Sequence, residues 1–136
     1  MWTYEYSLDT DKPAKDIWAR YSDHSTWTEW DHGLQLVEAD GPLAVGTTGS
    51  LTPTGQKPIP FTITEVEELS TFTDECSVGG LVIRFRHELS ALPGDGTRVT
   101  HGVVISGPGA DQMGPKIGPS ITADIPASVA TLVELA

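Results

Sequence analysis

Residues 81–106 constrain the fold of this sequence most strongly, because two segments with a period of two flank a tight turn. A strand places every second side chain on the same face, so each segment has an apolar face interrupted by a single histidine. These faces consist of Leu81, Ile83, Phe85, His87 and Leu89 in the first segment, and of Val99, His101, Val103 and Ile105 in the second. The Pro-Gly-Asp-Gly turn at residues 93–96 permits a chain reversal. We therefore predict a long antiparallel hairpin.

The position of the turn determines which residues of the hairpin face each other. If the chain reverses about Gly94, His87 lies directly opposite His101 on the apolar face. Histidine is the side chain that titrates nearest to neutral pH, so this pair is a candidate for acid/base catalysis or for contact with a ligand. The alternative is that the two rings hydrogen-bond each other, or a neighbouring strand residue, within the core.

Length and charge exclude several classes of function. A chain of 136 residues is long enough to bury one core, and we assign residues 1–136 to a single domain. With 8 Lys and Arg against 19 Asp and Glu, the net charge of −11 argues against nucleic-acid binding. The N-terminus lacks the features of a signal peptide, and no apolar run reaches the ~20 residues of a bilayer span. We expect a cytoplasmic protein without membrane insertion.

Alternating or helically spaced apolar residues predict the elements before the hairpin. The strands are expected at residues 2–8, 34–38, 46–51, 61–66 and 71–76, and two short helices at 12–22 and 25–30. Ser25 is the expected cap of the second helix. Because the connections between strands are short, consecutive strands should pair antiparallel, which gives a sheet of seven strands with the hairpin.

The segment after the hairpin is rich in glycine and proline, which predicts a loop over residues 107–118 and a helix that begins at about Pro119. The apolar stripe of this helix consists of Ile121, Ile125, Val129, Leu132 and Val133, extended backwards by Ile117. Pro126 lies inside the helix and removes one backbone hydrogen bond, so we predict a kink between residues 122 and 126.

Five segments carry a resemblance to a known family: YSDHSTWTEWDHGL (21–34), GPLAVGTTGSLTPTG (41–55), PFTITEVEE (60–68), RFRHEL (84–89) and GTRVTHGVVISGP (96–108). Together with the order of elements, they resemble the polyketide cyclase/dehydrase and lipid-transport branch of the START-like, birch-pollen-allergen-like superfamily, also called SRPBCC. The most specific motif combines Asp23, Trp27 and Trp30. The resemblance implies an α+β helix-grip fold, in which a curved seven-stranded antiparallel sheet wraps around a long C-terminal helix, with two short helices between strands 1 and 2.

The same resemblance implies a hydrophobic pocket between the sheet and the long helix. The candidate ligand-binding residues are Phe85, His87, His101, Val103, Trp30, Phe61, Ile121 and Ile125. His87 and His101 are also the candidates for catalysis. Asp31 and His32 follow the second helix and are expected to be exposed loop residues near the mouth of the pocket.

Other polar residues of the hairpin region are expected to have structural roles. A metal site would need a third ligand beside the two histidines, which Asp74 or Glu75 could supply only if it points inward, so we predict no metal and no cofactor. Arg84, Arg86 and Arg98 alternate to the opposite face of the hairpin. There we expect them to pair with Glu88, Asp74 or Glu75 on the solvated side of the sheet.

The sequence favours a protein that binds or carries a small hydrophobic or aromatic molecule, because few polar groups lie on the inward face. One alternative is an enzyme of the polyketide cyclase, aromatase or dehydrase type, with His87 and His101 as its acid/base pair. The other is a protein-interaction module of the co-chaperone type, in which an apolar groove receives a helix of another chain.

Overall fold

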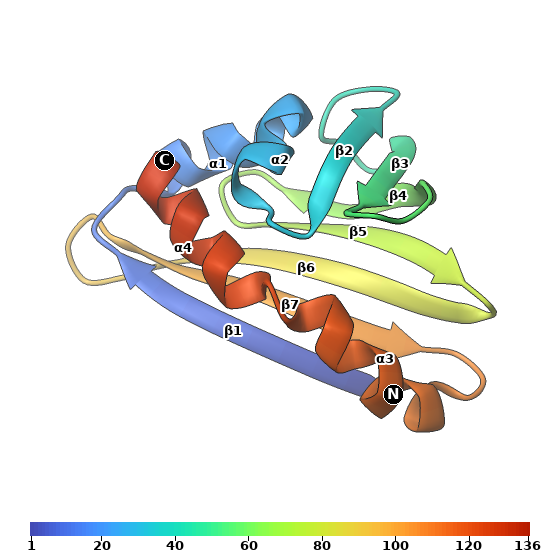
Figure 1. Cartoon of the computed structure of the whole chain (residues 1–136). Coiled ribbons are helices and arrows are strands. Elements are labelled where there is room, and N and C mark those ends of the chain that lie inside the picture. Colours follow the sequence, from blue (N-terminus) through green and yellow to red (C-terminus); the bar gives the residue numbers. More distant parts are fainter.

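Seven antiparallel strands form one curved sheet, and the helices lie on one of its faces (Figure 1). The structure is a computed structural model that describes residues 1–136. The strands are β1 (Trp2–Thr10), β2 (Leu34–Ala39), β3 (Thr48–Pro53), β4 (Ile59–Glu67), β5 (Thr71–Val78), β6 (Leu81–Ala91) and β7 (Thr97–Ser106). Their order in the sheet is β1-β7-β6-β5-β4-β3-β2. The sheet of seven antiparallel strands that the short connections predicted is confirmed.

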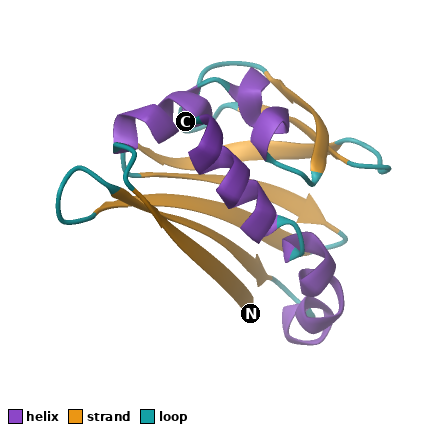
Figure 2. Cartoon of the chain, turned by 60° about the vertical axis from the view of Figure 1, so that its left-hand side comes forward, coloured by secondary structure: helices purple, strands orange, loops and turns teal.

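Two groups of helices cover the sheet. The helices are α1 (Ala14–Ser22), the single 3-10 turn η1 (His24–Thr26), α2 (Trp27–Trp30), α3 (Ala110–Thr122) and α4 (Ile125–Leu135). Helices α3 and α4 follow one another diagonally across the sheet, and α1 and α2 pack beside α4 (Figures 1 and 2). The arrangement is the helix grip expected from the sequence.

The hairpin has the register that its turn predicted. His87 pairs with His101 across β6 and β7, and Phe85 with Val103. The strand period then places both histidines on the face that the helices cover, where their relative accessible areas are 8% and 5%. The two rings are therefore brought together by backbone pairing and not by a loop.

The first two helices anchor the core at one end of the sheet. Helix α1 buries Ile17, Trp18 and Tyr21, of which Tyr21 follows Ile17 by four residues and Trp18 by three. The cap of the following turn is Asp23, whose carboxylate accepts a hydrogen bond from the Ser25 backbone N–H at 3.1 Å. The prediction of Ser25 as the cap is wrong, because the turn begins at His24, one residue earlier than expected.

The loop predicted over residues 107–118 is a helix in the structure. Helix α3 begins at Ala110, after Gly109 with a φ of 84°, and it contains two prolines in its interior. Gly114 and Gly118 lie one turn apart against Trp2 of β1, where a Cβ atom on either glycine would overlap the indole. These glycines therefore allow α3 to pack closely on β1. The sequence around them does not predict this contact.

The chain does break where the sequence predicted a kink. Helix α3 ends at Thr122 and α4 begins at Ile125, so Pro126 lies in the first turn of a new helix. At that position the missing N–H costs no intrahelical hydrogen bond. The predicted single helix with a kink is two helices in sequence.

The buried apolar residues form two clusters under these helices. The larger lies under α1, α2 and α4 and includes Tyr21, Trp27 and Phe72, whereas the smaller lies under α3 and includes Val103 and Ile105. Phe85 and Ile125 are only partly buried and pack against both clusters. The region between the clusters is therefore incompletely filled by side chains, and this region holds the candidate site.

Candidate ligand-binding cavity

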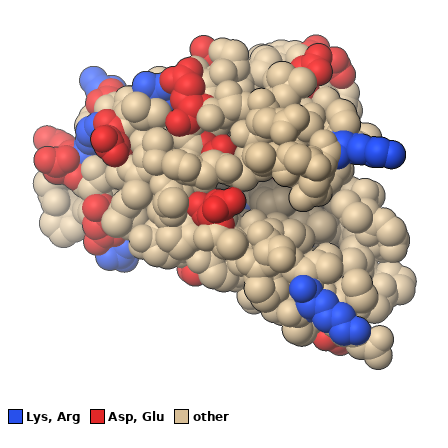
Figure 3. Space-filling model, in the orientation of Figure 1, with Lys and Arg blue, Asp and Glu red and all other residues tan.

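A cavity of about 460 Å³ lies between the sheet and helices α3 and α4 and opens to solvent. Figure 3 shows the opening as a hollow in the surface beside an acidic patch. Its apolar walls include Leu51, Ile59, Cys76, Ile83 and Phe85 from the sheet, and Trp30, Ile117, Ile121 and Ile125 from the helices. Its polar groups include Asp31, Gln56, His87, His101, Ser120, Asp124 and Ser128.

Six of the eight candidate residues named from the sequence line this cavity. They are Trp30, Phe85, His87, His101, Ile121 and Ile125. The other two lie outside it. Val103 is fully buried in the cluster under α3, and Phe61 packs against the Trp27 ring, with the ring centroids 6.2 Å apart. Their side chains share the inward face of the sheet but are covered by other side chains.

The two histidine rings meet in the cavity wall. Their centroids are 4.7 Å apart and their planes are inclined by 78°. The His87 ring lies parallel to Phe72, with centroids 3.9 Å apart, and the His101 and Trp30 rings meet edge to face, with centroids 5.6 Å apart. Aromatic contacts therefore hold both imidazoles in fixed orientations.

Each histidine makes one hydrogen bond to a buried group. His87 Nδ1 lies 3.1 Å from the carbonyl oxygen of Phe72, and His101 Nε2 lies 2.7 Å from the Tyr21 hydroxyl. No hydrogen bond joins the two rings. Tyr21 comes from α1, is fully buried, and was not among the candidate site residues. The only signal in the sequence was a tyrosine on the buried stripe of a helix, whose hydroxyl needs a partner.

Burial keeps both imidazoles neutral. Desolvation lowers the pKa of His87 to about 4, against a smaller opposing effect of the bond to Phe72. Burial also lowers the pKa of His101 well below its ordinary value, and the neighbouring His87 contributes in the same direction. At neutral pH, both rings can therefore act as hydrogen-bonding groups without carrying charge.

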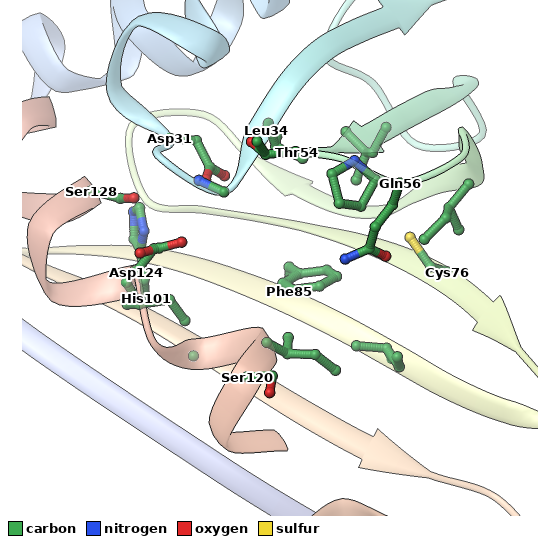
Figure 4. Close-up of a pocket in the computed structure, with 18 of the residues that line it drawn as sticks. Asp31, Leu34, Thr54, Gln56, Cys76, Phe85, His101, Ser120, Asp124 and Ser128 are labelled. Atoms are coloured by element: carbon green, nitrogen blue, oxygen red, sulfur yellow. The ribbon is translucent and has the colours of Figure 1, made fainter. Parts of the chain in front are cut away.

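Two carboxylates line the cavity. Figure 4 shows Asp31 and Asp124 near His101 at one end of the cavity, and Gln56 and Cys76 at the other. Burial raises the pKa of Asp31 to about 6, and the negative charge of Asp124 acts in the same direction. The hydrogen bond that Asp31 accepts from the Gly33 N–H at 3.0 Å opposes this rise in pKa. Asp31 is thus a cavity residue and not the exposed loop residue that we expected, whereas His32 is exposed.

Asp74 points inward in the register of β5, because it pairs with Phe85. It is 3% exposed, its Oδ1 atom has no hydrogen-bond partner, and it lies outside the cavity lining. Burial raises the pKa of Asp74 to about 8, and the charge of Asp31 contributes. The prediction that Asp74 pairs with an arginine on the solvated side is wrong, and no group of three metal-ligating residues assembles around it.

The arginines of the hairpin lie on the opposite face of the sheet, as predicted. Arg84 pairs with Glu75 at 2.9 Å and Arg86 with Glu88 at 2.7 Å, while Arg98 pairs with Asp9 of β1 at 2.8 Å. These ion pairs are partly exposed and contribute little to stability.

Neither protein-family models nor curated protein sequences give a match to this chain. Many solved structures match this chain, and the three described below cover 98% of it. None of the helices is long and apolar enough to cross a membrane.

Three of the similar structures have TM-scores of 0.74 to 0.76. Norcoclaurine synthase from Thalictrum flavum, in complex with dopamine and hydroxybenzaldehyde, has a TM-score of 0.74 at 15% identity, over 98% of this chain and 85% of that chain. Ara h 8.0201 has a TM-score of 0.76 at 15% identity, over 98% and 95%. Protein MLL2253 from Mesorhizobium loti has a TM-score of 0.76 at 18% identity, over 98% and 96%.

The fold and the cavity define an α+β helix-grip protein with an internal pocket. This is the fold of the SRPBCC, or Bet v 1-like, superfamily, to which these neighbours belong. The fold that the sequence segments implied is therefore confirmed.

Proposed function

We propose that this protein binds a small hydrophobic or aromatic molecule in the cavity between the sheet and helices α3 and α4. The observation that carries the proposal is the cavity itself, because about 460 Å³ of open volume lies between two otherwise packed apolar clusters. Protein interiors are normally filled to the density of organic crystals, and ligand pockets typically measure about 300–1,000 Å³.

The known neighbours support the same function. Bet v 1-like proteins bind hydrophobic ligands, and the norcoclaurine synthase structure contains dopamine and hydroxybenzaldehyde. The walls of the present cavity combine apolar side chains with a few polar groups, which is the composition typical of small-molecule sites. A protein that binds such a molecule could also carry it, and we propose transport only as an addition to binding.

A catalytic function of the polyketide cyclase or dehydrase type is the second candidate, since two imidazoles face the cavity. A general base works best when its pKa lies near the working pH, however, and burial holds the pKa of His87 near 4. Both rings are also held by buried partners. These properties favour hydrogen bonding to a bound molecule over proton transfer, so we give ligand binding first place.

Thermal unfolding with small neutral aromatics tests the binding function. Naphthalene and 2-naphthol should raise the melting temperature of the wild type, since a ligand at 100 times its Kd stabilises the fold by about 2.7 kcal/mol. Ile121→Trp fills the cavity and should abolish the shift. Met113→Trp places the same side chain at an exposed position of α3 and should retain it. An absent shift in the wild type, or equal shifts in both variants, would refute binding in this cavity.

A further inference from the structure

We infer that the cavity selects a neutral molecule with a hydroxyl group, such as a phenol or an enol, and holds this hydroxyl between His87 and His101. The inference rests on the proposed binding function and specifies the chemical class of the ligand. It follows from which nitrogen of each ring is occupied within the protein and which is left to the cavity.

The proton of His87 is located by its partner. The carbonyl oxygen of Phe72 can only accept a hydrogen bond, so His87 Nδ1, at 3.1 Å, donates. The Nε2 atom of this neutral ring is then an acceptor, and it makes no hydrogen bond within the protein. This unpartnered Nε2 atom is not fully buried, and His87 lines the cavity. His87 therefore presents an acceptor to a ligand.

The proton of His101 is located by a similar argument. Tyr21 is fully buried, and His101 Nε2 at 2.7 Å is the only partner of its hydroxyl. If Nε2 donated, the phenolic hydrogen would be buried without an acceptor, which is costly. Tyr21 therefore donates to Nε2, and the proton of His101 is on Nδ1, which has no partner within the protein. His101 presents a donor to the cavity in which His87 presents an acceptor.

A hydroxyl group complements this pair because its oxygen can accept from His101 while its hydrogen is donated to His87. The result is one directed chain, from Tyr21 through His101, the ligand and His87 to the carbonyl of Phe72. An ether or a ketone can only accept, and would leave His87 Nε2 without a hydrogen bond. A hydrocarbon would leave both nitrogens unpaired.

The two carboxylates of the cavity lining select against anions. Asp31 and Asp124 line the cavity, and their charges interact. Arg86 also borders the cavity, but its guanidinium pairs with Glu88 at 2.7 Å. A carboxylate ligand at the histidine pair would therefore lie near two acids without a cationic partner, so the favoured hydroxyl belongs to an uncharged molecule.

Calorimetric titration with three matched probes tests this inference: 2-naphthol donates and accepts, 2-methoxynaphthalene only accepts, and naphthalene does neither. We expect 2-naphthol to bind the wild type roughly tenfold more tightly than naphthalene, the effect of two neutral hydrogen bonds. The methyl ether should be weaker than 2-naphthol. His87→Phe keeps a ring beside Phe72 but removes the acceptor, so 2-naphthol should lose its advantage over the ether.

A second variant tests the histidine pair without changing a residue that lines the cavity. Tyr21 does not line the cavity, so Tyr21→Phe leaves the ligand contacts in place while it removes the donor that fixes the proton of His101. The preference for 2-naphthol should fall severalfold while the affinity for naphthalene is retained. His32→Phe changes an exposed histidine outside the cavity and is the control, with all three affinities unchanged.

The results distinguish a failure of hydroxyl selection from a failure of the proposed binding function. Equal affinities of the three probes for the wild type would overturn hydroxyl selection and leave the binding function intact. A preference for 2-naphthol that persists in both His87→Phe and Tyr21→Phe would also overturn it. If no probe binds, the binding function fails, and the selection fails with it.

Discussion

His87 and His101 face each other across β6 and β7 with their ring centroids 4.7 Å apart, yet each hydrogen-bonds a different buried residue. The strand register brings the rings together, and the partners Phe72 and Tyr21 determine which nitrogens remain for the cavity. The pair therefore links the regular geometry of a hairpin to the chemistry of a ligand-binding wall.

The bond between Tyr21 and His101 should contribute to stability. Tyr21→Phe removes the hydroxyl and leaves a buried ring nitrogen without its partner, so the free energy of unfolding should fall by about 1–3 kcal/mol. Tyr6→Phe is the control, because the partly buried Tyr6 hydroxyl makes no hydrogen bond, and this change should cost less. Urea denaturation measures both. Equal losses in the two variants would contradict the role of the buried bond.

Asp74 should make stability fall as the pH rises above neutrality. Burial raises the pKa of its carboxyl from 3.8 to about 8, so the folded chain retains a proton that the unfolded chain has lost between these values. The lowered pKa of His87 makes stability rise with pH, but only between its value of about 4 in the folded chain and its ordinary value of 6.5. The interval from pH 6.5 to 8 therefore isolates Asp74.

Over this interval the wild type should lose about 1–2 kcal/mol of unfolding free energy. Asp74→Asn cannot ionise and should show a flat profile, with greater stability than the wild type at pH 8. Asp95→Asn, at an exposed turn position, should keep the slope of the wild type. Denaturant titrations at several pH values provide the measurement, and a slope that survives in Asp74→Asn would assign it to another group.

The packing of Trp2 on α3 should reverse the usual preference for alanine in a helix. Gly118→Ala would normally stabilise a helix by about 1 kcal/mol, but here the added methyl group overlaps the indole, and we expect a loss of about 1–3 kcal/mol. In a Trp2→Ala background the same change should become neutral or stabilising. The exposed Lys116→Ala should have little effect in either background. A double-mutant cycle on melting curves that shows no coupling would contradict this packing.

Asp31 should make the binding of an anionic probe dependent on pH. Burial and the charge of Asp124 raise the pKa of Asp31 to about 6, so its negative charge is largely lost by about pH 5. The affinity for 2-naphthoate should then rise severalfold between about pH 7.5 and pH 5, while that for naphthalene stays constant. Asp31→Asn should bind 2-naphthoate more tightly at pH 7.5 and lose most of the pH dependence. Asp16→Asn, at an exposed position of α1, should behave as the wild type.

The sequence predicted the features that strand and helix periods govern. Alternation along residues 81–106 predicted the face of His87 and His101, because the side-chain period of a strand is fixed by backbone geometry, and the position of the turn predicted their register. Alternation along β5 likewise places Asp74 on the same face as Phe72 and Cys76, so the sequence pattern could have predicted that Asp74 points inward. We had instead named Asp74 as one of three possible partners of the arginines on the solvated side.

Contacts between distant segments were beyond the local pattern. The Tyr21–His101 bond joins residues 80 positions apart, and nothing in the sequence pairs them. Helix α3 depends on Trp2 packing against Gly114 and Gly118, whereas the local composition of residues 107–119 is that of a loop. Phe61 and Val103 were placed on the correct face, but only the tertiary structure shows which side chains cover them.

The imidazole nitrogens of His87 and His101 provide the most direct test of the account. In a two-dimensional NMR spectrum that correlates the ring nitrogens with the ring carbon-bound protons at pH 7, both rings should be neutral, with the proton on Nδ1. Addition of 2-naphthol should shift the resonances of His87 Nε2 and His101 Nδ1 and leave those of His24 and His32, which lie outside the cavity, unchanged. A proton on Nε2 of either ring, or resonances that do not respond to 2-naphthol, would contradict the proposed ligand site.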